Sequence, residues 1–121
     1  MLATGVDIVE IERVAELARR YGDRFGRRVF APDEWRDFRD RPSSLAARFA
    51  AKEAMIKALG CSEVALHEIR VVRGPGPEPR IELTGRAQAR AEQIAAHDIA
   101  LSLSHSQGLA VAVVVLQRST I

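Results

Sequence analysis

The chain is poor in the residues that build disulfides, zinc sites and aromatic cores. Its 121 residues include a single cysteine, Cys61, and only 5% aromatic residues. One cysteine cannot form an internal disulfide, and it offers no cluster of thiolates to a zinc ion. The core must therefore be built mainly from alanine, valine, isoleucine and leucine. The cysteine usage predicts a reduced, intracellular setting, which we take to be the cytoplasm.

Long apolar runs are also missing. No segment approaches the roughly 18 consecutive apolar residues of a membrane span. The first residues do not show the basic and then apolar pattern of a signal peptide. With 47% hydrophobic and 28% charged residues, the composition is that of an ordinary globular protein. We expect one domain, 1–121, and no membrane partner.

Positive and negative charges nearly balance, with 18 Lys and Arg against 16 Asp and Glu and a net charge of +2. Six arginines nevertheless crowd the first quarter of the chain: Arg13, Arg19, Arg20, Arg24, Arg27 and Arg28. A local basic surface of this kind predicts an acidic partner. Nucleic acid is one such partner, but the arginines are not interleaved with the aromatic residues that single-strand binders use for stacking, so an acidic protein or a phosphorylated small molecule is at least as good a match.

Hydrophobic periodicity predicts an α+β fold, with an antiparallel sheet packed against a long central helix and shorter helices. We expect strands at 2–9, 66–72, 80–83, 99–104 and 109–116, and helices at 10–21, 33–40, 44–59 and 85–96. Gly22 and Gly26 are expected to loosen the chain between the first two helices. The residues 106–108 are expected to form a tight hairpin, and the residues 74–79 a turn.

The central helix carries the most informative pattern. It is rich in strong helix formers, it follows Ser43 and Ser44 as candidate N-caps, and it ends at Gly60, a suitable C-cap. An apolar stripe runs along it at helical spacing: Leu45, Phe49, Ile56 and Leu59.

Three charged residues lie on or beside that apolar stripe. Lys52 falls inside it, Glu53 lies at its edge, and Lys57 follows one helical turn later. Charges on a core-facing helix indicate a binding site. The structural alternative is a solvated Glu–Lys pair together with a lysine stem that reaches out of the stripe.

An acidic residue also interrupts the first strand. Asp7 stands among apolar residues, so it is exposed on the outer face, paired, or bound to a cation, because burying it bare is costly. Asp7 and Glu53 together would supply the one or two carboxylates that Mg²⁺ usually takes from a protein. The central helix adds cations that can neutralise phosphate oxygens: Arg48, Lys52 and Lys57.

The sequence has no Walker-type glycine loop, no His-Glu-x-x-His and no nucleophile elbow. His105 precedes the expected hairpin turn, where a lone histidine is more often a surface residue. Composition and pattern alone therefore indicate Mg²⁺-dependent phosphate chemistry and no more specific reaction.

Three segments taken together resemble the holo-[acyl-carrier-protein] synthases, the small class of 4′-phosphopantetheinyl transferases. Residues 5–14 read GVDIVEIERV, residues 48–60 read RFAAKEAMIKALG, and residues 101–112 contain LSLSHS followed by AVA. The order and spacing of these motifs match the family over essentially the whole chain. The resemblance implies the fold of that family and a role in fatty acid and lipid biosynthesis.

The resemblance also implies roles for single residues. It makes Asp7 and Glu53 the ligands of Mg²⁺, and these two residues with Lys57 the catalytic residues. Four residues become candidates for contacts to the phosphates of coenzyme A: Arg48, Lys52, Lys57 and His105. Arg13 and Arg24 would face acyl carrier protein, and the family implies a homotrimer with sites at its subunit interfaces.

In the reaction that the resemblance implies, a serine hydroxyl of apo acyl carrier protein attacks the β-phosphate of coenzyme A. Adenosine 3′,5′-bisphosphate then leaves. The residues leave open whether a carboxylate such as Glu53 or a metal-bound water takes the serine proton. Two places depart from the family pattern: Pro77-Glu78-Pro79 stands where Gly-Lys-Pro is frequent, and Cys61-Ser62 stands where Thr-Gly is common. We assign the first of these loops no role.

Two other hypotheses remain. A non-catalytic basic module would dock an acidic protein or nucleic acid through the arginines of the first quarter, with steep salt dependence and no need for Mg²⁺. A relative of the transferases that has lost its activity is the third hypothesis, against which the intact Asp7, Glu53 and Lys57 argue.

Overall fold

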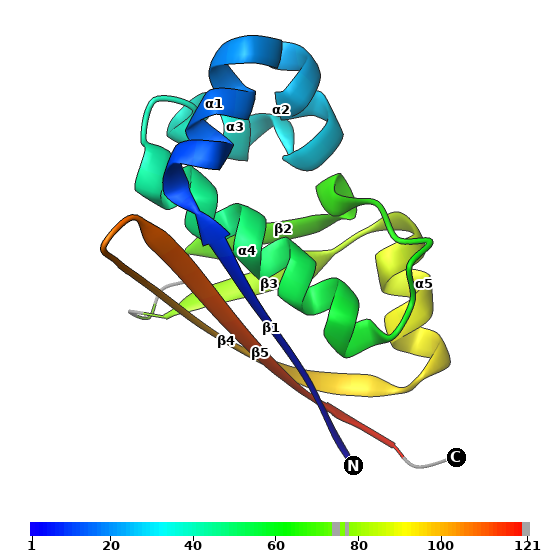
Figure 1. Cartoon of the computed structure of the whole chain (residues 1–121). Helices are drawn as coiled ribbons and strands as arrows, with labels where there is room; N and C mark the ends of the chain where they lie inside the picture. Colours follow the sequence, from blue (N-terminus) through cyan, green and yellow to red (C-terminus); the bar gives the residue numbers. More distant parts are fainter. Residues whose placement is uncertain (74–75, 77, 120–121) are drawn as a thin grey trace.

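One long helix lies between a three-stranded sheet and a smaller hairpin (Figure 1). The computed structural model describes residues 1–73, 76 and 78–119. Its elements in chain order are β1 (Leu2–Glu10), α1 (Ile11–Tyr21), α2 (Asp23–Val29), α3 (Pro32–Phe38), α4 (Pro42–Leu59), the 3-10 turn η1 (Leu66–Glu68), β2 (Ile69–Arg73), β3 (Pro79–Leu83), α5 (Gly85–Gln93), β4 (Ala96–Ser106) and β5 (Leu109–Arg118).

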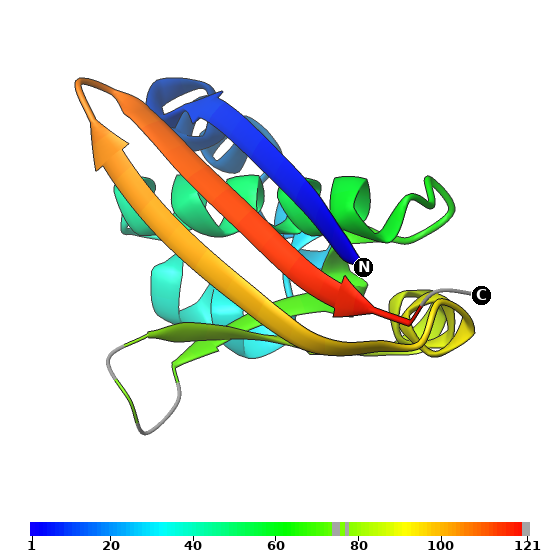
Figure 2. The same cartoon turned by 90° about the horizontal axis from the view of Figure 1, so that it is seen from below.

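The larger sheet has the strand order β1-β5-β4, and both of its strand pairs are antiparallel. Seen from below, its three strands cross in front of α4, and β2 and β3 form a separate antiparallel pair (Figure 2). The predicted antiparallel sheet packed on a long central helix is therefore confirmed. The tight turn between β4 and β5 is confirmed as well. Gln107 and Gly108 both have positive φ, 52° and 80°, as a two-residue type I′ hairpin requires.

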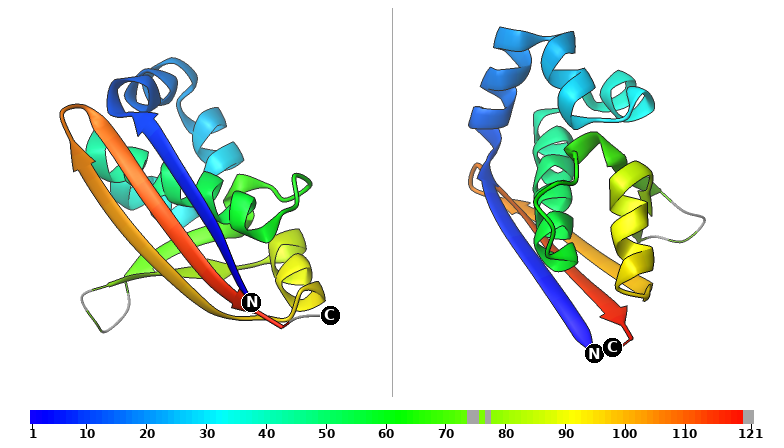
Figure 3. Two further views of the ribbon diagram at one scale, coloured as in Figure 1. Left: turned by 60° about the horizontal axis from the view of Figure 1, so that its bottom comes forward. Right: turned by 90° about the vertical axis from the view of Figure 1, so that its right-hand side faces the viewer.

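Small side chains let α4 approach the sheet closely. The alanines of α4 that are buried include Ala50, Ala51 and Ala54, and the sheet presents Ala110 and Ala112 toward them. In the side view, α4 lies between β1 on one side and α5 on the other (Figure 3). The helix is therefore buried on most of its surface, which is broader than the single stripe that the periodicity predicts.

Gly5 marks the closest contact between β1 and α4. A Cβ built on Gly5 would lie 1.8 Å from the carbonyl oxygen of Ala54, so no larger residue fits without moving the strand. We predict that Gly5→Ala lowers the free energy of unfolding by about 1–3 kcal/mol, the usual cost of overpacking. Chemical denaturation would measure it, with Thr4→Ala on the exposed face of β1 as the control. Equal stability of the two variants would contradict this contact.

The ends of α4 follow from its sequence only in part. Gly60 adopts a left-handed conformation with φ of 66° at the C-terminus, as predicted. The N-terminus begins at Pro42, before the two serines that were candidate caps, because proline suits the first helical position. Along the predicted stripe, Leu45 and Leu59 are fully buried, whereas Phe49 and Ile56 are half-buried.

The structure corrects the prediction of a loose segment around Gly22 and Gly26. Gly22, with a φ of 53°, does separate α1 from α2, but the residues after it form the helix α2. Gly26 lies inside this helix, where the ring of Trp35 packs 2.5 Å from the place that a Cβ would take. The ring nitrogen of Trp35 donates a hydrogen bond of 2.9 Å to Asp23 Oδ1. A second core cluster therefore forms under α1, α2 and α3, around Phe25, Phe30 and Trp35.

Smaller differences concern element ends. The expected strand at 66–72 begins with the turn η1 and becomes β2 only at Ile69, and α5 ends at Gln93 because Ala95 has a positive φ of 53°. The predicted turn at 74–79 falls partly on residues 74, 75 and 77, which lie outside the described residues.

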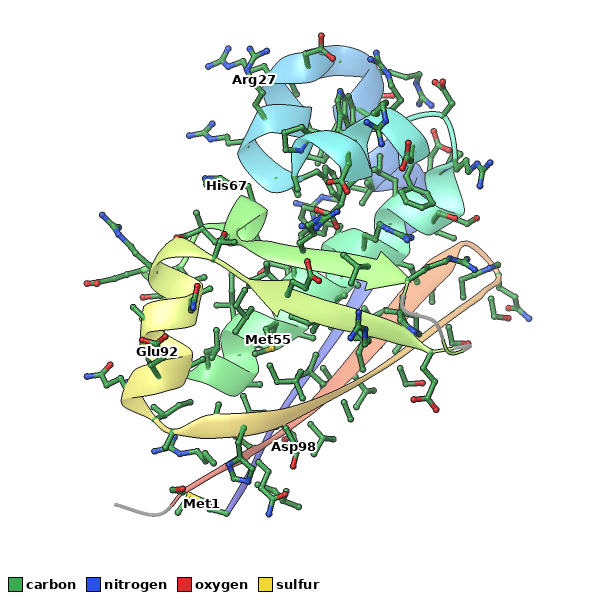
Figure 4. The ribbon with its side chains drawn as sticks, turned by 180° about the vertical axis from the view of Figure 1, so that it is seen from behind. Met1, Arg27, Met55, His67, Glu92 and Asp98 are labelled. Atoms are coloured by element: carbon green, nitrogen blue, oxygen red, sulfur yellow. The ribbon has the colours of Figure 1, made fainter. Side chains whose placement is uncertain are left out.

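Met55 of α4 points into the interior beneath the β2–β3 hairpin (Figure 4). Within the described residues, no helix has the length and hydropathy that crossing a membrane requires.

Candidate active site

Asp7 and Glu53 meet in one cavity between β1 and α4. In β1, alternate residues face α4, and Asp7 lies on the same face as Gly5 and Val9. The cavity has a volume of about 250 Å³, and it is lined by Asp7, Ile8, Val9, Arg13, Val14, Leu17, Phe49 and Glu53. Asp7 is 19% exposed, so its carboxylate is neither on the outer face of the sheet nor fully buried.

Lys57 reaches across to the same strand. Its Nζ lies 3.2 Å from Asp7 Oδ1 and donates a hydrogen bond of 2.8 Å to the carbonyl oxygen of Val6. Burial raises the pKa of the Glu53 carboxyl, the negative charge of Asp7 raises it further, and the positive charge of Lys57 opposes both effects. The structure thus brings together Asp7, Glu53 and Lys57, with two acids close enough to repel each other.

The raised pKa has a consequence for stability. Between the ordinary glutamate value of 4.5 and the raised value, the folded chain binds more protons at Glu53 than the unfolded chain does. The contribution of Glu53 to stability is therefore favourable only at low pH and is lost as the pH rises through that window. A cation placed between the two carboxylates would relieve the same repulsion.

The carboxylate pair suits a magnesium ion. Within the described residues, no group of three or more His, Cys, Asp and Glu side chains forms a closed metal site. Mg²⁺ does not require one, because it usually binds one or two protein carboxylates and fills its octahedron with waters and substrate phosphates. Asp7 and Glu53 offer hard oxygen ligands in an open cavity, and their mutual repulsion favours a divalent cation.

The structure contradicts the prediction that Lys52 contacts a phosphate. Lys52 is fully buried, and its Nζ lies 2.6 Å from Oε1 of Glu34, which is itself only 2% exposed. The ammonium also donates to the carbonyl oxygens of Leu66 and Ile69. Lys52, the lysine within the apolar stripe of α4, is therefore one partner of a buried ion pair between α4 and α3. Its side chain is not accessible to a ligand.

Arg48 lies on the other side of α4 from the carboxylates. It lines a separate cavity of about 530 Å³ that shares no lining residue with the cavity of Asp7 and Glu53. Its guanidinium stacks 3.5 Å from the centre of the Phe38 ring, and its Nε has no hydrogen-bond partner within the described chain. Burial lowers the pKa of this guanidinium. His105 is exposed in β4, opposite Ala110, and it does not line the cavity of Asp7 and Glu53.

The chain is similar to known proteins over nearly its whole length. The sequence profile described as the 4′-phosphopantetheinyl transferase superfamily matches residues 3–114. The holo-[acyl-carrier-protein] synthase of Herpetosiphon aurantiacus is 44% identical over 124 residues, which cover 95% of this chain and 98% of the relative. That of Dehalococcoides mccartyi is 45% identical over 118 residues, which cover 97% and 99%. The chain belongs to the holo-[acyl-carrier-protein] synthase family of 4′-phosphopantetheinyl transferases.

Solved structures of this family share the fold. The Helicobacter pylori holo-[acyl-carrier-protein] synthase in complex with coenzyme A has a TM-score of 0.83 and 32% identity, over 94% of this chain and 99% of that one. The Chronobacterium ammoniagenes ACPS–coenzyme A complex has a TM-score of 0.85 and 34% identity, over 99% of both chains. The α+β fold predicted for this phosphopantetheinyl transferase is thus confirmed.

The arginines of this transferase differ in whether their side chains are already paired with acidic residues of the same chain. Arg13 is exposed on α1 and lines the cavity of Asp7 and Glu53. Arg24 of α2 borders a neighbouring hollow of about 320 Å³, with Leu17, Tyr21, Phe25 and Arg28 as its other lining residues. Arg19 is held by Glu12 at 2.8 Å and Glu16 at 2.6 Å, so it is less available to a partner.

Sequence reasoning missed Glu34 and Arg73. Glu34 is buried, and besides Lys52 it accepts hydrogen bonds from the backbone nitrogens of Ala31, at 2.9 Å, and Val71, at 3.0 Å. The available signal was its position, the third residue of a helix that starts at Pro32, which is where a glutamate reaches back to the N-cap. No local pattern points to Arg73, which faces the cavity of Arg48 from β2.

Proposed function

We propose that this protein transfers the 4′-phosphopantetheine group of coenzyme A to a serine of apo acyl carrier protein. The reaction depends on Mg²⁺ and releases adenosine 3′,5′-bisphosphate. The observation that carries the proposal is the convergence of Asp7, Glu53 and Lys57 on one side of α4, in a fold shared with structures described as coenzyme A complexes. We further propose that the enzyme works in the cytoplasm, in lipid biosynthesis.

The three residues have separate tasks. Asp7 and Glu53 would hold the Mg²⁺, which supplies charge neutralisation at the pyrophosphate when it is bound. Lys57 places its ammonium beside the same carboxylates, where it offsets the charge that develops on the phosphoryl oxygens.

Bond changes follow from these positions. The serine oxygen forms a bond to the β-phosphorus of coenzyme A, and the bond from that phosphorus to the bridging oxygen breaks. The bridging oxygen leaves with adenosine 3′,5′-bisphosphate, and the serine proton passes to a base such as Glu53. Most of the rate enhancement then comes from holding the hydroxyl and the pyrophosphate in line in a charge-compensated site.

A mass measurement tests the reaction. The protein, coenzyme A and Mg²⁺ are incubated with apo acyl carrier protein, and the mass of the carrier protein is determined. We expect a gain of one phosphopantetheine group that disappears when EDTA is added. No gain with any of several carrier proteins would overturn the proposal. Salt-sensitive binding without a need for Mg²⁺ would instead favour the basic docking module.

Acyl carrier protein is proposed to dock on α1 and α2, where Arg13 and Arg24 lie beside the two cavities. We predict that Arg13→Glu raises the KM for the carrier protein by about tenfold at low salt, because it reverses a charge at the rim of the contact. The KM for coenzyme A should change much less, although Arg13 also lines the cavity of Asp7 and Glu53. Arg86→Glu, the same charge change on exposed α5, is the control, and an equal effect of both variants would contradict this docking surface.

Homotrimer formation is supported by the outer face of the large sheet. The side chains that point away from α4 include five exposed large hydrophobic residues: Leu2, Val6, Ile8, Leu109 and Val113. Val6 and Ile8 are 52% and 61% exposed, and they lie opposite Val113 and Val111 in the sheet. A contiguous apolar face of this kind marks a protein contact. We propose that further copies of the same chain cover it.

The distance between the carboxylates and Arg48 within one chain supports a site that is shared between two copies. Asp7 and Glu53 lie on one side of α4, and Arg48 lies in another cavity that includes Val113 and Val115 of the outer sheet face. A neighbouring copy that covers the outer face would therefore border the cavity of Arg48. We propose that each complete site takes its carboxylates from one copy and Arg48 from the next.

Mixed assemblies test this sharing. We predict that Glu53→Gln and Arg48→Ala are each nearly inactive alone, but that trimers reassembled from equal amounts of both recover about one quarter of wild-type activity, because some interfaces then combine two intact halves. Transfer would be measured after dissociation and reassembly, with each variant reassembled alone as the control. No recovery would place the whole site within one chain.

A further inference from the structure

A further cavity of about 650 Å³ lies between α2, α3 and η1. It shares no lining residue with the cavity of Asp7 and Glu53 or with that of Arg48. Arg27 and His67, which both line it, lie at the helical end of the molecule, away from the three-stranded sheet (Figure 4). Further copies of the chain on the outer face of that sheet would therefore leave this cavity open.

Phe30 and Trp35 give this cavity an aromatic wall. Their rings are nearly parallel, with 19° between the planes and 6.1 Å between the centroids. Trp35 is firmly held, because its Nε1 donates a hydrogen bond of 2.9 Å to Asp23 Oδ1 and the guanidinium of Arg39 lies 5.1 Å from its ring centre. Gly26 leaves room for the same ring. The wall is therefore preformed, as is usual in small-molecule sites.

The rim of the cavity carries a positive charge without an acidic partner. Arg27 lines the cavity from α2, and no ion pair within the described part of the chain includes it. The other charged groups at the cavity are paired, Asp23 with Arg39 and Arg70 with two acids. The hydrogen bond from Trp35 and then the charge of Arg39 are the main causes of the lowered pKa of Asp23, and Arg27 adds a smaller effect.

A basic hollow of about 360 Å³ adjoins the cavity. It is lined by Arg24, Arg27, Arg28 and His67, so Arg27 and His67 border both spaces. Three guanidinium groups and one imidazole therefore surround one end of the aromatic cavity. An anionic group at this end would accept charge-assisted hydrogen bonds from the arginines, while an apolar body attached to it would stay against the aromatic wall.

We propose that the cavity of Trp35 is a second ligand site, which binds a compact aromatic molecule with one anionic group, such as an aryl sulfonate or an aryl carboxylate. The ring system lies against Phe30 and Trp35, and the anionic group lies at Arg27 and His67. A cavity of about this volume suits a small organic ligand. The aromatic wall and the basic rim together select a molecule that is apolar at one end and negatively charged at the other.

Trp35 provides the signal for a direct test, because it is the only tryptophan of the chain. Its indole N–H gives a single resonance in a nitrogen–proton correlation spectrum of the full-length protein. The probe is anilinonaphthalene sulfonate, titrated at low salt without coenzyme A or carrier protein. We expect a saturable shift of this resonance. The Kd should be about tenfold lower than that of phenylnaphthylamine, which has the same aromatic rings but no sulfonate.

Arg27→Glu should raise the Kd of the sulfonate by about tenfold or more and change that of the neutral analogue much less, because it reverses the charge at the rim. Arg20→Glu is the matched control, since Arg20 is exposed on α1 and does not line the cavity. It should nearly keep the wild-type Kd.

Three results would overturn this inference. They are an indole resonance of Trp35 that does not shift with the sulfonate, equal affinity for the sulfonate and its neutral analogue, and equal weakening by Arg27→Glu and Arg20→Glu. The sulfonate would then bind elsewhere, for example on the apolar outer face of the sheet. Because no transfer reaction is measured, the outcome is independent of the proposed function.

Discussion

Glu53→Gln is expected to abolish Mg²⁺-dependent transfer without harming the fold. The amide keeps the size of the side chain but removes the charge that holds the cation and the base that can accept the serine proton. We expect a loss in turnover of about a hundredfold or more. The mass gain of acyl carrier protein over time measures it. Glu63→Gln, the same change at an exposed glutamate outside the site, is the control.

The same variant should be at least as stable as the wild type in the absence of Mg²⁺. In the wild type, the charged form of Glu53 is disfavoured by burial and by Asp7. Because the raised pKa costs stability as the pH rises above the ordinary value of 4.5, the advantage of Glu53→Gln should grow with pH over that window. Thermal melting at several pH values measures it. Near-normal turnover would contradict the role of Glu53 as a Mg²⁺ ligand. A melting temperature below that of the wild type at all pH values would contradict the unfavourable burial of its charge.

Lys52→Met is expected to have the largest effect on stability. Removing the ammonium leaves Glu34 buried without its counter-charge, and breaking a buried ion pair in this way costs about 3–5 kcal/mol. The ion pair also joins α3 to α4 and, through the Val71 nitrogen, to β2. Urea unfolding of the variant measures the loss, and a partly unfolded chain at room temperature would agree with it.

Lys57→Met is the matched control for Lys52→Met. Lys57 is 54% exposed and its contact to Asp7 is a surface pair, which contributes little to stability. This variant should remain folded and lose activity, whereas Lys52→Met should lose stability first. The double change Lys52→Met with Glu34→Gln should recover part of that stability, because no charge is then left buried and unpaired. Equal stability of Lys52→Met and Lys57→Met would contradict the buried ion pair of Lys52 with Glu34, and Lys52 would again be a candidate for contact with a phosphate.

Local patterns predicted the parts of the site that depend on one element. The alternation in β1 and the helical period of α4 depend on neighbours within a few residues, so the sequence shows them directly. Asp7, Glu53 and Lys57 were therefore found as candidates before their contacts were known. The turn at Gln107 and Gly108 is of the same kind, since its backbone conformation depends mainly on those two residues.

The helix α2 and the role of Lys52 could not be predicted in this way. The segment around Gly26, expected to be loose, is a helix that packs against Trp35, nine residues after Gly26. Lys52 is not a ligand contact because Glu34, 18 residues earlier, reaches the same buried point. Burial and partner choice depend on contacts between distant segments, and no local period records them.

The sequence by itself therefore determined the family and most of the elements, and it indicated Asp7, Glu53 and Lys57 as candidate residues of the reaction centre. Only the tertiary structure decided which charges are open to a ligand. It buried Lys52 against Glu34, placed Arg48 on the far side of α4 from Asp7, and brought Arg73 beside Arg48. The physical reason is that a charge is available or satisfied according to its neighbours in space, and those neighbours come from other elements of the fold.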